Sequence, residues 1–492
     1  MADENEVHLT YPLSKKTPKT KHRKKIWLTI GAIVLILLVL GAISGYQVKA
    51  AYGLIMEGKD HLATVQDLAV QQDLKKAETE IELAEEKFSA AQEKFNTARW
   101  AVIIPYVGTQ VSAAGTILDS AVALTSGMSQ AVSAGLSIME PMQAEATTSF
   151  NQLTTAQKKD ALNKLSAAAP LFEQISTDFK AINERLLKLS DFGVMEQIVE
   201  AKRLIIEKMP MAESFMNELT LGAKILPKIG GHPNEQQYLF VSQNNNELRA
   251  SGGFIGNIGK IRIYEAEIKE FNTKGVYNLD AEAPVKIEPP DYLQEYLSAS
   301  TWFLRDANTC VGCVDFGVAA RKILEFYKIE TGNENFDGVI SITPTFLEDL
   351  LEITGPVSVP GYPYKFDSQN VTETIQQHVE YNYAQMGIAM ADRQSIVSDL
   401  SNVLLQKIIT LPKEKWLDLF QVLQVAFTEK HAMIYAKNPE AQAALREQKW
   451  TSELANDFAQ DYVTIADNNM AALKTDRVMD RAVNYEVNLT DP

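Results

Sequence analysis

The sequence predicts an α/β fold, a mixed sheet covered by helices, preceded by an all-helical module and one N-terminal transmembrane helix. Three observations lead to this prediction. An uncharged apolar stretch lies near the N-terminus, long helix-periodic segments follow it, and short apolar strands alternate with helices beyond about residue 236. A chain of 492 residues is long enough for two or three folded units, and 46% hydrophobic residues are enough for a buried core.

The apolar stretch is residues 26–46, IWLTIGAIVLILLVLGAISGY, which contains no charge and no proline. As a helix it would be about 30 Å long, the thickness of the hydrocarbon core of a membrane. Seven lysines and arginines within residues 1–25 precede it, and such a basic tail favours the cytoplasm. We therefore expect a single-pass protein of the cell membrane, anchored through Ile26–Tyr46, with its bulk outside. A signal peptide cleaved near Ala42-Ile43-Ser44 is the alternative, although its apolar region would be unusually long.

Residues 48–225 are expected to form an extracytoplasmic helical stalk or bundle. Apolar residues from Ile81 to Phe95 recur at helical spacing, with glutamates and lysines between them. Between Arg99 and Glu140 the only charge is Asp119, and small residues are abundant. Closely packed helices of a bundle explain this composition, and a second transmembrane helix is the alternative.

Residues 236–490 are expected to form the α/β domain. Apolar runs predict strands at 238–243, 253–264, 268–271, 338–342 and 356–359, and helical patterns occur at 315–329, 370–385, 391–409 and 413–427. Thr343 and Pro344 are typical of a helix start, and Gly355 of a helix end. Alternating polar and apolar residues predict a half-buried strand over 482–490, so we expect the domain to continue beyond the given chain.

The net charge of −16 excludes one class of partner. Residues 1–25 carry seven basic and three acidic side chains, +4 in total, so the remainder carries −20. A body with this much negative charge repels phosphate backbones, and the sequence contains no basic stripe with interleaved aromatic residues. We therefore expect no nucleic-acid partner. Cys310 and Cys313 are the only cysteines, which leaves a zinc site without enough ligands. We expect a disulfide between them outside the membrane, and a thioredoxin-like redox pair is the alternative.

Several motifs occur together in the second half of the chain. They are QNNNELRASGGFIGNIGKI (243–261), TWFLRDAN (301–308), FDGVISITPTFLEDLLEITGPVSVPGY (336–362), DRQSIVSDLSNVLLQKI (392–408) and ADNNMAALKTDR (466–477). With these motifs the chain resembles the bacterial domain-of-unknown-function family 4012 over about residues 236–490. That family has no settled activity, so the resemblance implies an architecture rather than a reaction.

A more distant resemblance is to the LytR-CpsA-Psr phosphotransferases. Glu247–Ser251 is similar to the acidic-x-Arg motif after their first strand, residues 337–359 to their strand–helix–strand unit, and Arg393-Gln394 to their Arg-Gln helix opening. Those enzymes transfer glycopolymers from a polyprenyl diphosphate carrier to the cell wall. The resemblance therefore implies a polyprenyl-phosphate-linked glycan or cell-wall polymer as partner, and Mg²⁺ as cofactor. Ser251-Gly252 replaces the family's Asp-Thr, so any phosphotransferase would have degenerate motifs, and no catalytic residue is assigned.

The candidate ligand-binding residues are polar groups in these motifs: Asn246, Glu247, Arg249, Arg305, Asp306, Arg393 and Gln394. Guanidinium forks bind phosphate oxygens bidentately, and amide donors at a helix start favour anions. The alternatives are structural ion pairs for Arg249 and Arg305, an ordinary exposed charge at a helix start for Arg393, and loop capping for the asparagines. We thus expect either an envelope protein that binds or transfers a phosphate-linked glycopolymer, or a non-catalytic surface scaffold. Convergence of Arg249, Arg305 and Arg393 in one place would favour the ligand site.

Overall fold

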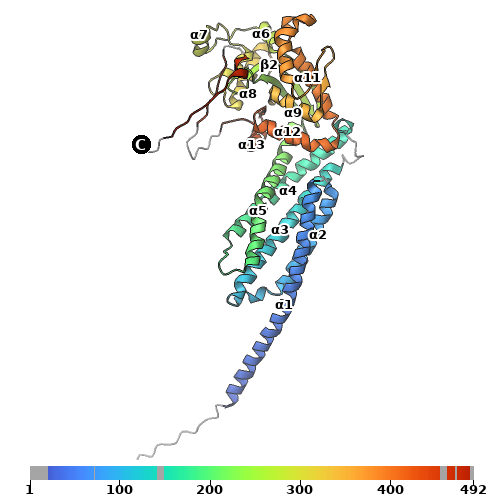
Figure 1. Ribbon diagram of the computed structural model, residues 1–492, viewed down its shortest axis with the longest axis vertical. Coiled ribbons are helices and arrows are strands. Elements are labelled where there is room, and N and C mark those ends of the chain that lie inside the picture. Colours follow the sequence, from blue (N-terminus) through green and yellow to red (C-terminus); the bar gives the residue numbers. More distant parts are fainter. Residues whose placement is uncertain (1–19, 71–72, 141–148, 455–462, 471–473, 488–492) are drawn as a thin grey trace, which may run out of the picture. The chain divides into compact units, whose positions relative to one another are not determined.

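The computed structural model describes residues 20–70, 73–140, 149–454, 463–470 and 474–487 (Figure 1). The chain divides into two compact units. The first unit consists of Met1–Val132 and Phe179–Pro210, and the second consists of Ser133–Asp178 and Met211–Pro492. This division falls within three long helices, whereas the sequence places a domain boundary between residues 225 and 236. The predicted domain limits stay predictions.

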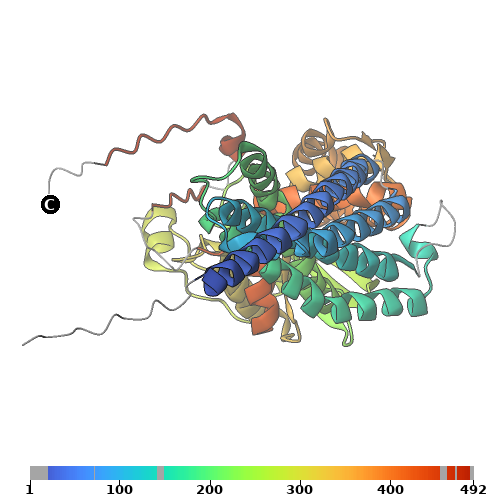
Figure 2. The ribbon, with the colours of Figure 1, turned by 90° about the horizontal axis from the view of Figure 1, so that it is seen from below.

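The first unit is built from long helices. They are α1 (Thr20–Val70), α2 (Leu74–Asn96) and α3 (Val107–Met139), with the short 3₁₀ helix η1 (Arg99–Ile103), and parts of α4 (Thr155–Lys188) and α5 (Glu196–Ile229). Helices α1 and α2 lie side by side (Figures 1 and 2), and Ala51, Phe88, Phe95 and Leu118 form a core with their neighbours. The expected helical module is confirmed.

The expected membrane segment lies within α1. Among the residues that the structure describes, no helix combines the length and the apolar character needed to cross a membrane. The side chains of residues 26–34 and 36–38, most of the expected segment, lie outside the described part of the chain. The membrane segment therefore stays a prediction.

The second unit contains a five-stranded mixed sheet with the order β3-β2-β1-β4-β7. Its strands are β1 (Gln236–Asn244), β2 (Phe254–Tyr264), β3 (Glu267–Gly275), β4 (Gly338–Ile342) and β7 (Ala432–Ala436). Strands β1 and β4 are parallel, and the other neighbours are antiparallel. Glu265 and Ala266, both with positive φ, form the two-residue turn between β2 and β3. The mixed α/β sheet is confirmed.

Helices cover both faces of this sheet. They are α6 (Val276–Glu282), α7 (Asp291–Leu297), α8 (Phe316–Thr331), α9 (Pro344–Thr354), α10 (Val371–Gln377), α11 (Ser395–Ile409), α12 (Trp416–Thr428) and α13 (Pro439–Glu447). Because strand side chains alternate, Leu239 and Val241 of β1 pack with Ile323 of α8 on one face, whereas Phe240 packs with Leu347 of α9 on the other.

Single turns complete the unit. They are the 3₁₀ helices η3 (Phe150–Gln152), η4 (Leu304–Thr309), η6 (Ala384–Met386), η7 (Met390–Asp392), η8 (Lys413–Lys415) and η9 (Lys474–Val478), and the π-helical turn η5 (His378–Asn382). The helix expected over 370–385 therefore ends at Gln377 and continues as irregular turns. Strands β5 (Val357–Ser358) and β6 (Lys365–Phe366) form a separate antiparallel pair, so the expected returning strand does not join the main sheet.

The strand expected over 482–490 is not found. Residues 482–487 have no regular secondary structure and are exposed, and residues 488–490 lie outside the described part of the chain. The prediction is wrong for the described residues, because a strand exists only within a hydrogen-bonded ladder and no described strand pairs with this segment. Alternation in the sequence indicates a face to bury but does not provide the neighbouring strand.

Candidate functional site

The loop after β1 leads into the candidate site. Ligands of α/β sheets bind at the carboxyl ends of parallel strands, which here are the ends of β1 and β4. The Oδ1 of Asn244 accepts a hydrogen bond from the backbone N–H of Asn246 (3.1 Å), and Asn245 Nδ2 donates to Thr345 Oγ1 (3.0 Å). The consecutive asparagines thus shape this loop and fasten it to the start of α9.

Arg249 lies buried beneath the loop, with 1% of its side chain exposed. Its Nη1 donates to the carbonyls of Leu248 (3.0 Å) and Asn469 (2.7 Å), and its Nη2 to Glu247 Oε1 (3.2 Å) and Asp306 Oδ1 (3.3 Å). These contacts join three segments of the chain. The contacts with Glu247 and Asp306 are ion pairs, which is the structural alternative stated above for Arg249. A ligand would have to displace these partners to reach the terminal nitrogens.

Gly252 and Gly253 follow Arg249 closely, and glycines can allow a ligand close to the backbone. A Cβ on Gly252, whose φ is +114°, would lie 2.4 Å from Gln243 Oε1, and a Cβ on Gly253 would lie 2.0 Å from the carbonyl oxygen of Asn244. The N–H of Gly253 donates to the same Gln243 Oε1 (2.8 Å). The protein's own groups therefore fill this space, and the glycines serve the packing of the loop against β1.

Arg305 and Asp306 come from η4. Arg305 Nη1 donates to Asp280 Oδ2 (2.8 Å), and its Nε lies 3.5 Å from Asp306 Oδ2. The guanidinium carbon is 4.1 Å from the centre of the Phe303 ring and 5.3 Å from that of Tyr277. Arg305 is thus paired with carboxylates on one side and stacked on aromatic rings on the other.

Two buried carboxyl groups lie behind Arg305, and the sequence offered no signal for either. Burial raises the pKa of Asp280 to about 6, although Arg305 opposes the shift. Burial and the neighbouring Asp280 raise the pKa of Glu330 to about 7. Asp280 Oδ1 and Glu330 Oε2 are buried and have no hydrogen-bond donor among the described residues. Two buried negative charges would repel each other, so burial and proximity both favour the protonated forms of these groups.

Arg393 differs from Arg249 and Arg305 in its lack of a carboxylate partner among the described residues. It is half-buried in the turn before α11, with its guanidinium carbon 5.7 Å from the centre of the Tyr277 ring. In the described part of the chain no carboxylate forms an ion pair with it. The neighbouring Gln394 is 8% exposed, its carbonyl accepts from Asn257 Nδ2 (3.0 Å), and its buried Oε1 has no donor among the same residues.

Tyr277, the second residue of α6, joins these side chains into what we call the arginine–tyrosine cluster: Tyr277, Phe254, Arg249, Arg305 and Arg393. The Tyr277 and Phe254 rings are 5.9 Å apart, and Arg249 lies 5.5 Å from the centre of Phe254. Burial raises the pKa of the Tyr277 hydroxyl, and the positive charges of Arg305 and Arg393 oppose this shift. The structure therefore brings the three candidate arginines together around two aromatic rings, and 36% of Tyr277 is exposed to solvent.

The residues around the cluster do not fit a divalent cation. Among the described residues, no three His, Cys, Asp or Glu side chains are grouped so that they could hold a metal ion. The acidic side chains nearest the cluster pair with arginines instead, as Glu247 and Asp306 do with Arg249. No step through Mg²⁺ is derived for this site. Beyond η4, Cys310 and Cys313 form a disulfide.

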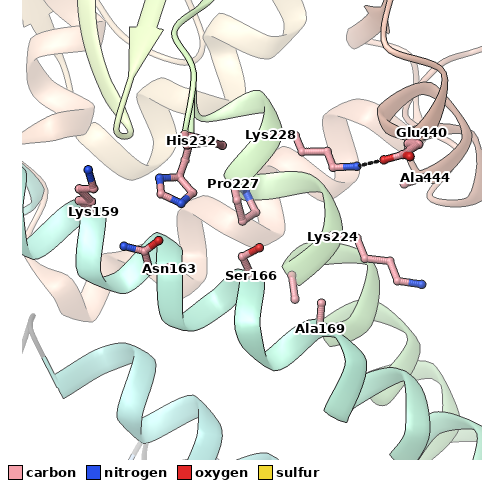
Figure 3. Close-up of a pocket in the computed structure, with 12 residues that line it drawn as sticks. Lys159, Asn163, Ser166, Ala169, Lys224, Pro227, Lys228, His232, Glu440 and Ala444 are labelled. Carbon is pink, nitrogen blue, oxygen red and sulfur yellow. Dashed lines mark hydrogen bonds and ion pairs between the residues drawn. The ribbon is translucent and has the colours of Figure 1, made fainter.

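A groove of about 740 Å³ lies elsewhere in the second unit, between α4, α5 and α13 (Figure 3). None of the candidate residues lines it. Its charged groups are engaged in pairs: Lys228 with Glu440 (2.6 Å), Lys224 with Glu173 (2.8 Å) and His232 with Glu265 (2.8 Å). We therefore place the candidate site at the arginine–tyrosine cluster and not in this groove.

The fold and the cluster define an α/β domain with an arginine-rich polar site at the carboxyl end of its parallel strands. Residues 234–379 match the model of a family described as a protein of unknown function (DUF4012). This stretch therefore carries a domain of that family, as the sequence motifs predicted. The match includes Arg249, Tyr277 and Arg305, whereas Arg393 lies beyond it. No curated protein and no solved structure matches the chain. The LytR-CpsA-Psr resemblance stays a prediction.

Proposed function

We propose that this chain is a single-pass protein of the cell envelope whose extracytoplasmic α/β domain binds a phosphate-bearing glycan or its polyprenyl phosphate carrier at the arginine–tyrosine cluster. The anchor is the apolar stretch 26–46, which follows a basic tail. The anchor would hold the domain near the membrane surface, where lipid-linked glycans are found. The proposal concerns binding alone and includes no transfer step.

The observation that carries the proposal is the state of Arg393. Its guanidinium has no carboxylate partner among the described residues, and it shares the Tyr277 ring with Arg305. A half-buried guanidinium without a counter-ion favours an anion, and its planar fork suits phosphate or carboxylate oxygens. Tyr277 beside it offers a partly exposed aromatic face on which a sugar ring or lipid can pack.

The binding test uses the full chain in detergent and a short-chain polyprenyl diphosphate as probe. Arg393→Ala removes the guanidinium, and we expect the affinity to fall about tenfold, the contribution of one charge-assisted bidentate contact. Arg321→Ala is the matched control, because Arg321 lies 5.7 Å from the ring centre of Tyr435 in the same domain. Equal affinity of wild type and Arg393→Ala for the probe would remove the site.

The extracytoplasmic placement has its own test. Protease added to intact cells should digest the part of the chain beyond residue 50 while the basic tail stays protected. A chain that remains intact on whole cells, yet is digested in a lysate, would overturn the placement and the envelope ligand with it.

A second candidate function, a non-catalytic surface scaffold, is favoured by the state of Arg249. All the terminal nitrogens of this buried side chain already have partners within the domain. An arginine used in this way stabilises loops and is not available to a ligand. If neither the diphosphate probe nor a purified phosphate-bearing cell-wall polymer binds the wild-type chain, the scaffold becomes the better account.

A further inference from the structure

The turn between α2 and α3 exposes apolar side chains in the first unit. Residues 100–118 contain no charge. Ile103 is 81% exposed, Tyr106 67% and Val102 51%. The turn is tightly built, because a Cβ on Gly108 would lie 2.1 Å from the carbonyl oxygen of Val102. These apolar groups are therefore held outward by the backbone.

A second loop brings further apolar side chains to the same end of the unit. Gln110, near the start of α3, donates from Nε2 to the carbonyl of Gly193 (2.6 Å) and accepts at Oε1 from the N–H of Met195 (2.8 Å). Gly193 and Met195 belong to the loop between α4 and α5. Phe192 in this loop is 91% exposed and Met195 46%. We call Val102, Ile103, Tyr106, Phe192 and Met195 the apolar tip.

Two hydrogen bonds fix the level of the apolar tip along α1. Ser44 Oγ donates to the carbonyl of Thr97 (3.0 Å), and the indole N–H of Trp100 donates to Ser44 Oγ (3.0 Å). Ser44 lies at the end of the apolar stretch 26–46. The part of α1 before it continues past the ends of the neighbouring helices (Figure 1), and Ile43 and Tyr46 on it are 52% and 74% exposed.

We propose that the apolar tip docks on the lipid surface of the bilayer that α1 crosses, with its aromatic and aliphatic side chains in the interfacial region. This inference rests on the proposed membrane anchor. Aromatic residues favour the interface between hydrocarbon and water, and exposed apolar groups gathered at one place mark an interaction site. Because the tip lies at the level where the anchor would leave the bilayer, lipid is the partner that its position and chemistry fit.

The neighbouring charges agree with this placement. Lys49 is exposed on α1 one turn beyond Tyr46, where an ammonium group would meet lipid phosphates. Arg99 at the edge of the tip pairs with Asp119 (2.5 Å), and Asp191 pairs with Lys202. These two charges beside the tip are therefore neutralised within the protein, whereas Glu196, which follows Met195, is exposed. Contact at both the anchor and the tip would fix the direction in which the helical unit leaves the membrane.

The test reads lipid contact at single introduced cysteines in the full chain, in phosphatidylcholine–phosphatidylglycerol vesicles. The two native cysteines form a disulfide, so each introduced thiol is the only free one. Ile103→Cys and Phe192→Cys place an environment-sensitive fluorophore on the tip. Lys75→Cys is the control at the far end of α2, about 33 Å away for 22 helical residues. Leu40→Cys reports on the anchor itself.

We expect nitroxide-bearing lipids to quench the labels at 103 and 192 at least threefold more than the label at 75, and Phe192→Lys to reduce the quenching at 103 at least twofold. Quenching at 40 without quenching at 103 and 192 would overturn docking and leave the anchor standing. No quenching at 40 would overturn the anchor and the docking together. A label at 103 that is shielded in proportion to protein concentration, and not quenched by lipid, would assign the tip to a second copy of the chain.

Discussion

Carboxyl groups at the turn between β2 and β3 and carboxyl groups beside the arginine–tyrosine cluster have pKa values shifted in opposite directions. At the turn between β2 and β3, Glu267 is bound by Lys269, Thr155 and Lys158, and these partners lower its pKa to about 2. At the other end, behind the arginine–tyrosine cluster, burial raises the pKa values of Asp280 and Glu330 to about 6 and about 7. At the turn, hydrogen-bond partners favour the ionised form of Glu267, whereas burial favours the protonated forms of Asp280 and Glu330.

This difference separates structural charges from candidates for function. Ion pairs with exposed partners contribute modestly to stability and leave little for a ligand to gain. Buried acids with displaced pKa values are found most often where a protein binds or reacts. Arg305, which pairs with Asp280, belongs to a cluster that also contains Arg393, an arginine with no carboxylate partner among the described residues. The turn therefore fastens the sheet to α4, and the cluster remains the site to test.

The largest effect is expected for Arg249→Ala. This change leaves Glu247 without its buried ion-pair partner, while Asp306 keeps Arg305. Removing one member of a buried ion pair costs about 3–5 kcal/mol. Unfolding by urea, followed by circular dichroism, measures the loss. Arg321→Ala, an exposed arginine of the same domain, should change the free energy of unfolding by less than about 0.5 kcal/mol. A loss for Arg249→Ala as small as this would mean that its ion pairs do not stabilise the loop.

A smaller effect, with a definite pH dependence, is expected for Glu330→Gln. At pH 8 the folded wild type must hold an ionised Glu330 beside Asp280, so the neutral amide should stabilise the fold by about 1–2 kcal/mol. As the pH falls from 8 to 5, folded Glu330 takes up a proton while the unfolded chain stays ionised. The wild type therefore gains stability, and the advantage of the variant disappears.

Thermal unfolding at several pH values measures this difference. Glu325→Gln on the same helix is the matched control, because Glu325 is exposed and pairs with Lys322 (2.7 Å). Its difference from the wild type should not change between pH 8 and pH 5. A flat difference for Glu330→Gln as well would contradict the buried acid pair.

The smallest effect is expected for Glu267→Gln at the turn. The depressed pKa of this carboxylate contributes stability that is fully present above about pH 4.5 and is lost as the pH falls through about 2. Because Glu267 and its partner Lys269 are partly exposed and screened by water, we expect a loss of roughly 1 kcal/mol at pH 7. Urea titrations at pH 7, 4 and 2.5 should show the difference shrink, and Glu282→Gln, an exposed acid, should show none. A difference that grows toward low pH would contradict the assignment.

Much of the fold could be predicted from local patterns. The strand at 338–342 and the helix with Pro344 at its start and Gly355 after its end follow from the chemistry of neighbouring residues. Helix α13 and strand β7 were not predicted. Strand β7 takes its place by pairing with β4, a partner far away in the sequence. The irregular end of the helix expected over 370–385 was also missed.

The sequence by itself determined the helical module and the α/β character of the second half, because helix and strand periodicity depend on residues close together in the chain. Its motifs also indicated the family whose model matches residues 234–379. The tertiary structure alone decided that Arg249 is buried among ion pairs, that Arg393 stays unpaired beside Tyr277 in the described chain, and that Asp280 lies near Glu330. These residues are separated by up to 144 positions, from Arg249 to Arg393. The charge and hydration of such groups depend on neighbours that only folding brings together, so no local pattern could specify them.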